Sequence, residues 1–246
     1  MIEEATYNGL TVSMDVVTDF EKHRLESFFS KEPETIRWID ELMGAGEVFY
    51  DIGANVGVFT LYAALRHPEL VVRAFEPAFH NYYRLCRNIE INRAGALAYC
   101  LALGDEPSSR AMDLASTESG SASHWFEGGA SQREGATPAF SQGALTAPLD
   151  TLVDAFGFPV PQHVKVDTDG YEEHFVRGAR QTLRDARLRS LLIEVTNSDG
   201  SRERIVRAMR EAGFHEEHPL NSIPEHSRIR REQSGNAHIE NIIFTR

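Results

Sequence analysis

The chain has few cysteines and no long apolar run. Only two of its 246 residues are cysteines, Cys86 and Cys100, and they fall in an expected helix and an expected strand. We interpret both as buried thiols rather than as a disulfide or a pair of metal ligands. The sequence shows neither the apolar region of a signal peptide nor a run long enough to cross a bilayer. These absences predict a soluble, cytoplasmic protein.

Basic residues are also in short supply. The chain has 25 Lys and Arg against 37 Asp and Glu, and its formal net charge is −12. Nucleic-acid binding depends on Lys and Arg that neutralise phosphates. The charge balance therefore argues against a nucleic-acid partner.

The sequence lacks the G-x-G-x-x-G turn of a dinucleotide-binding fold, in which the middle glycine admits a pyrophosphate. Instead, an apolar strand at 48–50 is followed by Asp51, by Gly53 and Gly57, and by a helical apolar pattern. A glycine turn between a strand and a helix brings backbone N–H groups close to a ligand. Asp51 would repel a pyrophosphate, whereas a carboxylate suits a cationic ligand such as the amino acid moiety and sulfonium of S-adenosylmethionine.

Gly53 and Gly57 are expected to let the cofactor approach closely, although both also fit a plain strand-to-helix turn. Asn55, between them, either donates to the cofactor carboxylate or supports the turn. A second strand, at 71–75, ends in Glu76, nineteen positions after Gly57. In a nucleotide-binding βαβ unit an acid about 20 residues on binds the ribose hydroxyls. Together these residues predict a site for an adenosine-bearing cofactor.

Strands and helices alternate along the rest of the chain, which shows no internal repeat. Such alternation predicts an α/β domain with a doubly wound, mostly parallel sheet and helices on both faces. We expect seven strands, the last two forming an antiparallel pair at the sheet edge. They lie at 48–50, 71–75, 97–103, 163–166, 190–194, 214–219 and 241–245.

Two segments stand outside this alternation. Residues 1–45 are expected to form an N-terminal extension, a strand hairpin and two helices separated at Pro33, before a main domain at 46–246. The segment 106–148 is rich in Ser, Gly and Ala and shows little periodicity. Loops of this length are usually functional lids or disordered. Trp125, beside another aromatic residue, favours a lid insertion.

Carboxylates follow the ends of five successive predicted strands: Asp51, Glu76, Asp105, Asp167 and Glu194. In open α/β sheets, ligands bind outside these ends, where the strand order reverses. Five carboxylates along one edge would repel one another unless a cation, hydrogen bonds or raised pKa values relieve them. A strand-end Asp is also a common cap of the next helix. We expect the first three to bind the cofactor and the last two to carry the chemistry.

Three motifs resemble the FkbM-type family of S-adenosylmethionine-dependent methyltransferases: 51–57 (DIGANVG), 75–77 (FEP) and 164–172 (VKVDTDGYE). The first is shared by class I methyltransferases in general, and the third is more specific to this family. The resemblance implies a Rossmann-like class I methyltransferase fold with 1–45 lying over the cleft. It also implies O-methylation of a hydroxyl on a sugar, glycan or polyketide-type acceptor.

Methyl transfer to a hydroxyl needs a base or a metal ion, because the pKa of an alcohol is very high. Asp167 is our first candidate for the base, and Glu194 is the second. Asp169 stands where the family commonly has Glu, so a carboxylate is kept there on a shorter side chain. A divalent ion such as Mg²⁺, held by Asp167, Asp169 and Glu194, stays open. Asp169, Tyr171 and Trp125 are expected to contact the acceptor.

Two other functions stay open. A non-catalytic module would keep the pocket and bind S-adenosylmethionine without turning over an acceptor. A Rossmann-type oxidoreductase would use the same frame but would bind NAD, whose usual glycine turn is missing here. The main expectation is an S-adenosylmethionine-dependent methyltransferase with a small-molecule or glycan acceptor.

Overall fold

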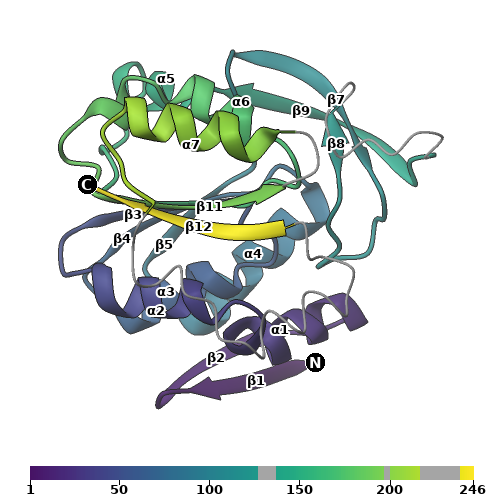
Figure 1. Cartoon of the computed structure of the whole chain (residues 1–246). Helices are drawn as coiled ribbons and strands as arrows, with labels where there is room; N and C mark the ends of the chain where they lie inside the picture. The colour runs from purple at the N-terminus through teal and green to yellow at the C-terminus, as the bar shows by residue number, and fades with distance from the viewer. Residues whose placement is uncertain (127–136, 197–199, 217–238) are drawn as a thin grey trace.

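A central sheet organises the computed structural model, which describes residues 1–126, 137–196, 200–216 and 239–246 (Figure 1). Its six strands are β3 (Val48–Ile52), β4 (Val71–Phe75), β5 (Ala96–Tyr99), β10 (His163–Val166), β11 (Ser190–Thr196) and β12 (Ile239–Thr245). They lie in the order β12-β11-β10-β3-β4-β5. All neighbours are parallel except β11 and β12, which are antiparallel.

The chain crosses the sheet in two directions from its middle. It runs outward through β3, β4 and β5, and then in the other direction through β10, β11 and β12. The strand order therefore reverses between β3 and β10, the place where open α/β sheets bind ligands.

Helices cover both faces of this sheet (Figure 1). One face carries α5 (Leu149–Asp154), α6 (Glu172–Gly178) and α7 (Ser201–Glu211), and the other carries α2 (Pro33–Leu42), α3 (Val58–Arg66) and α4 (Phe79–Asn92). The expected doubly wound, mostly parallel α/β fold is confirmed. No helix in the described ranges is both long enough and apolar enough to cross a membrane.

The number of strands differs from our expectation, because the described residues place six rather than seven in the central sheet. The expected strand at 214–219 is represented by one bridge, between His215 and Thr245. These two residues exchange backbone hydrogen bonds of 2.7 and 3.0 Å, and a single pair does not extend into a ladder. Residues 217–219 of this expected strand lie outside the described part of the chain.

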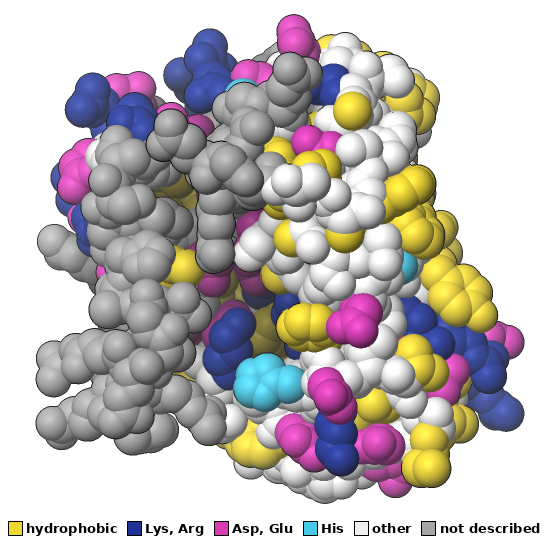
Figure 2. Space-filling view, turned by 90° about the vertical axis from the view of Figure 1, so that its right-hand side faces the viewer, with side chains coloured by type: hydrophobic (Ala, Val, Ile, Leu, Met, Phe, Trp, Pro, Cys, Tyr) yellow, Lys and Arg dark blue, Asp and Glu magenta, His cyan; other side chains and the backbone are white. Residues whose placement is uncertain are grey.

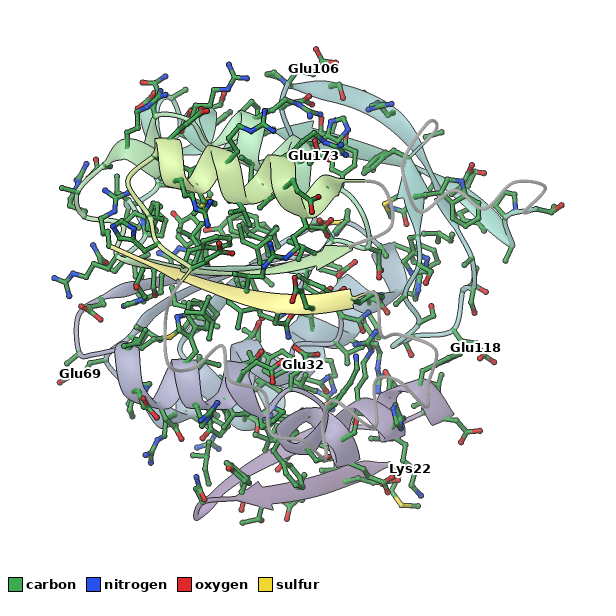
Figure 3. The ribbon with its side chains drawn as sticks, in the orientation of Figure 1. Lys22, Glu32, Glu69, Glu106, Glu118 and Glu173 are labelled. Carbon is green, nitrogen blue, oxygen red and sulfur yellow. The ribbon has the colours of Figure 1, made fainter. Side chains whose placement is uncertain are left out.

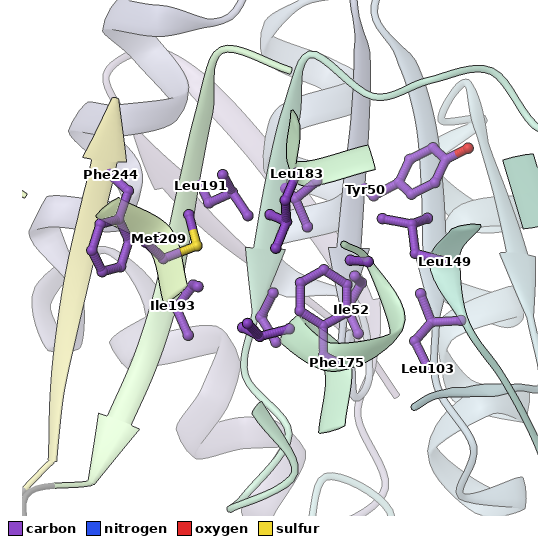
Figure 4. Packing of buried hydrophobic residues seen from close by; sticks show 14 of the residues in the cluster. Tyr50, Ile52, Leu103, Leu149, Phe175, Leu183, Leu191, Ile193, Met209 and Phe244 are labelled. Carbon is purple, nitrogen blue, oxygen red and sulfur yellow. The ribbon is translucent and has the colours of Figure 1, made fainter. Parts of the chain in front are cut away.

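The two strands at the middle of the sheet are buried along their whole length. Every residue of β3 and of β10 is buried, as is typical of parallel strands covered on both faces. Tyr50 and Ile52 belong to the core cluster that includes Phe175 of α6 and Leu191 of β11 (Figure 4). Phe49 belongs to a second cluster on the opposite face, so β3 contributes to both cores.

The N-terminal residues share the second of these cores. They form the hairpin β1 (Ile2–Tyr7) and β2 (Leu10–Asp15), followed by α1 (Asp19–Lys31). Thr18 caps α1 in a capping box, in which its hydroxyl accepts from the N–H of Glu21 and the Glu21 carboxylate accepts from the N–H of Thr18. Val12 and Leu25 pack in one cluster with residues of β3 and α3. This packing fixes α1 beside the carboxyl ends of the central strands.

A second, four-stranded sheet occupies much of the segment that we predicted as an insertion. Its strands are β6 (Ala102–Leu103), β7 (Ser108–Leu114), β8 (Trp125–Phe126) and β9 (Phe140–Ala147), in the order β6-β9-β7-β8. The strand expected at 97–103 is therefore divided between two sheets as β5 and β6. Sequence periodicity missed β7 and β9 because backbone pairing over seven positions, not an apolar pattern, holds them together.

Candidate functional site

A cavity of about 490 Å³ opens at the carboxyl ends of β3, β4, β10 and β11. One face of α1, the stretch 122–126 and the start of β12 complete its walls. The volume is in the range of small-molecule and cofactor sites, and the position is the one at which the strand order reverses. Figure 2, which views the molecule from the right-hand side of Figure 1, shows acidic and basic side chains close together in a hollow on this face.

Glu76 directly follows β4, and its side chain is hydrogen-bonded to the turn that follows β3. Its Oε2 accepts from the backbone N–H of Asn55 and its Oε1 from that of Ala78, both at 2.8 Å. The side chain lines the cavity and is 5% exposed, and burial raises its pKa to about 7 in spite of these two hydrogen bonds. Each oxygen keeps a second lone pair, so the carboxylate is able to accept hydrogen bonds from two hydroxyl groups.

Gly53 connects this turn to the end of β10. Its φ of +78° favours glycine, and a Cβ atom at this position would lie 1.7 Å from the backbone oxygen of Asp167. On the same strand pair, the N–H of Asp167 donates to the Ile52 oxygen at 3.0 Å. Close packing between strand ends therefore explains Gly53, which also lines the cavity.

Gly57 and Asn55 serve the turn itself. Gly57 has a φ of +93°, which favours glycine, and a Cβ atom there would lie 2.5 Å from Cδ1 of Leu85, at the end of a flexible side chain. The side chain of Asn55 donates to the Ser121 oxygen at 2.8 Å and accepts from the N–H of Val56 at 2.9 Å. Of the two roles that we considered for Asn55, these contacts favour support of the turn.

Asp51 lies behind the cavity rather than in its wall. It is 1% exposed, and its Oδ2 accepts from the Thr60 hydroxyl at 2.5 Å. Its Oδ1 is buried without a hydrogen-bond partner among the described residues. Burial raises its pKa, and the charge of Lys165 opposes that shift. We infer that Asp51 acts on the site through the helix that it anchors and the nearby lysine.

Lys165 is a buried charged residue beside the site that sequence reasoning missed. It belongs to β10, is 1% exposed, and its Nζ lies 3.0 Å from Oδ2 of Asp167 and 5.0 Å from the centre of the Phe59 ring. Burial alone would raise the pKa of Asp167, but the charges of Lys165, Lys31 and Arg24 outweigh burial and lower it. A lysine inside an apolar strand, two positions before a strand-end Asp, was the available signal.

Three carboxylates meet at one end of the cavity. One oxygen each of Asp167, Asp169 and Glu194 lies within 4.8 Å of the others. Asp169 has a φ of +54°, and its Oδ2 accepts from the N–H of Ser123 at 2.8 Å. Burial, followed by the charges of Asp167 and other nearby acids, raises the pKa of Glu194 well above its ordinary range.

These oxygens fit a divalent cation in part. Hard oxygen ligands suit Mg²⁺, and three carboxylates at this separation are able to hold one ion between them. One oxygen of Asp167 already binds Lys165, and one of Asp169 already accepts from a backbone N–H. The remaining oxygens of these two residues and the Glu194 carboxylate are the ones that would coordinate the metal.

Asp105 lies away from the cavity walls. Its carboxylate accepts from Nδ1 of His174 at 3.0 Å and from Nε of Arg177 at 3.1 Å. Burial would raise its pKa, but these two partners outweigh burial and lower it. Asp105 ties the end of β6 to α6, and the structure gives it no place in the cofactor cavity. The strand-end pattern alone did not separate this residue from the others.

The aromatic residues that we expected at the acceptor site do line the cavity. Tyr171 is 8% exposed and its hydroxyl accepts from Arg110 at 3.1 Å. Trp125 is 5% exposed, and its Nε1 is buried without a hydrogen-bond partner among the residues the structure describes. An indole N–H in a cavity wall suits an acceptor atom of a bound molecule.

The stretch that leads to Trp125 is tied to the site. Asn55 and Asn81 both donate to the Ser121 oxygen, at 2.8 and 3.1 Å. Thr18 and Arg24 donate to the oxygens of Ser119 and Gly120, both at 2.6 Å. This stretch therefore bridges α1, α4 and the turn after β3. Residues 127–136 of the predicted lid lie outside the described part of the chain.

Comparison with known proteins agrees with this geometry. The family model described as the methyltransferase FkbM domain matches residues 51–216. The 31-O-demethyl-FK506 methyltransferase FkbM of Streptomyces tacrolimicus is 44% identical over 68 residues, 27% of this chain and 26% of that protein. Methyltransferase 1 of Beauveria bassiana is 40% identical over 63 residues, 25% of each chain. The matched stretches thus span about a quarter of these relatives.

Solved structures show the fold alone. Fibrillarin from Aeropyrum pernix, with natively bound S-adenosyl-L-methionine, has a TM-score of 0.52 and 10% identity over 99% of this chain and 82% of its own. The tRNA (uracil-54, C5)-methyltransferase of Pyrococcus abyssi, with S-adenosyl-L-homocysteine, has a TM-score of 0.51 and 14% identity over 100% of this chain and 44% of its own. The fold is therefore that of class I methyltransferases. Because the FkbM model covers well over half of the chain, this protein belongs to the FkbM methyltransferase family.

Proposed function

We propose that this protein transfers a methyl group from S-adenosylmethionine to a hydroxyl of a small-molecule acceptor of sugar, glycan or polyketide type. One observation carries the proposal. The same cavity is lined by Glu76, which would accept ribose hydroxyls, and by the three carboxylates of Asp167, Asp169 and Glu194. The cofactor and the acceptor hydroxyl would meet between them.

The protein's residues orient the reactants and accept a proton. Bound S-adenosylmethionine would supply a methyl group already activated by the sulfonium. Glu76 would bind the ribose, and Asp167 would take the acceptor's hydroxyl proton as the methyl moves, a role that typically contributes 10²–10⁴-fold. Lys165 favours the ionised form of Asp167, which a base needs.

A divalent ion is a second possibility at the same place. Asp167, Asp169 and Glu194 would hold Mg²⁺, and the ion would lower the pKa of a hydroxyl bound to it. Chelation distinguishes this arrangement from a bare carboxylate base.

Two observations support a hydroxyl of a small molecule as the acceptor. The relative from Streptomyces tacrolimicus is named for O-methylation, and 44% identity over 68 residues ties part of this chain to it. A net charge of −12 argues against a nucleic-acid acceptor.

Calorimetric titration tests the cofactor first. We expect S-adenosylmethionine to bind at micromolar concentrations and NAD to give no signal. NAD binding without an S-adenosylmethionine signal would contradict the proposal. Methyl transfer from radiolabelled cofactor to a panel of hydroxylated sugars, nucleotide-sugars and macrolides then tests turnover. Cofactor binding without transfer to any member would favour a non-catalytic module.

A further inference from the structure

Helix α1 presents a row of hydrogen-bond donors to the cavity. His23, Ser27 and Lys31 are four residues apart, so they lie on one face of the helix, and Arg24 lies beside them. All four line the 490 Å³ cavity described above. They also line an adjoining cavity of about 580 Å³, which does not include Gly53 or Glu76.

These basic side chains have few partners of their own. Lys31 lies 3.6 Å from Oε1 of Glu32, and the Lys31 side chain is 51% exposed. Arg24 uses its Nε for the Gly120 oxygen at 2.6 Å. Within the described residues, neither Arg24 nor His23 forms an ion pair with a carboxylate. Among these residues, nothing else occupies the Nη atoms of Arg24 or the imidazole of His23, so both groups are open to a bound molecule.

The acidic end of the cavity has hydrogen-bond and ion-pair partners that do not come from α1. Asp167 already has Lys165 as its ion-pair partner at 3.0 Å. Oδ2 of Asp169 accepts from the backbone N–H of Ser123 at 2.8 Å. Among the described residues, no side chain of α1 forms an ion pair with Asp167, Asp169 or Glu194, so these acids do not neutralise the basic face of α1.

We propose that His23, Arg24 and Lys31 bind an anionic group of the acceptor, a carboxylate or a phosphate, where the two cavities meet. The inference rests on the proposed function and names its substrate class. Phe20, Phe28 and Phe59 line the adjoining cavity, so an apolar part of the acceptor would lie there. In a chain of net charge −12, a cationic wall inside a cavity concentrates attraction for an anion at one place.

Nuclear magnetic resonance on the full chain tests this proposal. The chain has two tryptophans, so it gives two indole N–H signals. Trp125 lines both cavities, whereas Trp38 is fully buried and donates to Ser190, and its signal serves as the internal reference. Inorganic phosphate and acetate are titrated separately into the protein saturated with S-adenosylhomocysteine. We expect the Trp125 signal to move saturably at millimolar anion, and the tighter of the two anions identifies the phosphate or the carboxylate.

Three variants locate the anion. Lys31→Gln and His23→Gln should each weaken its binding about tenfold, because a hydrogen bond to a charged group contributes roughly 1.5–3 kcal/mol. Lys22→Gln is the matched control, because Lys22 belongs to the same helix, is exposed and lines neither cavity (Figure 3). Lys22→Gln should leave binding unchanged. An equal loss in all three variants would overturn the proposal, since it would indicate general charge attraction.

A second cofactor analogue tests whether the basic residues serve the cofactor instead. Methylthioadenosine lacks the amino acid moiety of S-adenosylhomocysteine. If either anion bound only to the methylthioadenosine complex, it would occupy the place of the cofactor's own carboxylate, and the anionic acceptor would be refuted. Absence of saturable binding with both analogues would refute it too. A protein that binds neither analogue would refute the proposed function, and the two failures are therefore distinct.

Discussion

The ammonium of Lys165 lies 3.0 Å from Oδ2 of Asp167, and the two residues, two positions apart at the end of β10, point to the same side of the strand. Lys165 is 1% exposed, so its charge depends on carboxylates for compensation. Any substitution of Asp167 therefore has two consequences, one for the chemistry and one for the stability of the fold.

The variant Asp167→Asn should lower turnover by about two to four decades, the usual contribution of a positioned proton acceptor. It should also lower the free energy of unfolding by roughly 3 kcal/mol, because a buried charge loses its partner. The double variant Lys165→Met, Asp167→Asn should recover the stability but not the turnover. Chemical denaturation and a single-turnover assay measure the two effects. Parental turnover in Asp167→Asn would move the base to Glu194.

Chelation separates a bare carboxylate from a metal site. If Asp167, Asp169 and Glu194 act without an ion, the parent enzyme should keep its rate in EDTA, and added magnesium should change it less than twofold or so. Loss of activity in EDTA, restored by magnesium, would assign the three carboxylates to an ion instead. Glu173→Gln serves as a control for the loss of a nearby acid. Glu173 (Figure 3) pairs with Arg204 and does not line the cavity, so this variant should respond to EDTA and magnesium as the parent does.

Cofactor affinity should depend on pH through Glu76. Its pKa is raised to about 7 by burial, and the ionised form is the stronger acceptor for ribose hydroxyls. Affinity should therefore rise as pH increases through 7, and binding near pH 7 should release protons. Calorimetry in buffers of different ionisation enthalpy measures that release directly.

Replacement of Glu76 tests the same contact. Glu76→Gln should weaken cofactor binding by about one to two decades, because an amide cannot accept from both backbone N–H groups and the ribose. It should also abolish the pH dependence. Glu69→Gln, an exposed acid before β4, should change neither property. Unchanged affinity in Glu76→Gln would show that another residue binds the ribose.

Hydrogen exchange in the stretch before Trp125 should depend both on bound cofactor and on the hydrogen bonds that hold this stretch in place. We predicted 106–148 as a lid insertion, and within it the structure shows Gly120 and Ser121 hydrogen-bonded to Asn81. Asn81→Ala removes both bonds, so hydrogen exchange at the Gly120 amide, which loses its acceptor, should accelerate by roughly tenfold. Cofactor should slow exchange over 116–126 in the parent. Tyr83→Ala, on the exposed face of the same helix, is the control. Equal and strong protection with and without cofactor would instead indicate rigid structure.

The sequence alone predicted the features that depend on the order of the elements and on short spacings along the chain. Alternating strands and helices predicted the doubly wound sheet, and Glu76 followed from its distance to the glycine turn. Asp105 was misplaced because its two partners, on α6, are 69 and 72 residues away in sequence. The donors on α1 were missed for a similar reason. The family resemblance implied that 1–45 lies over the cleft, but nothing near His23 or Lys31 in the sequence indicates which face of the helix lines the cavity. Strands β7 and β9 were missed because they are held together by backbone hydrogen bonds, and a Ser- and Gly-rich sequence does not indicate which segments pair in this way.

The close contact between Gly53 and the backbone of Asp167 has a consequence for protein engineering. Because the backbone of Asp167 leaves no room for a methyl group at residue 53, a library that varies residue 53 would mostly yield misfolded proteins. The cavity-lining face of α1 and the start of β12, at Ile239 and Glu240, line the same cavity but are free of this constraint. Selection for new acceptors should therefore randomise α1 and β12 and keep residue 53 fixed.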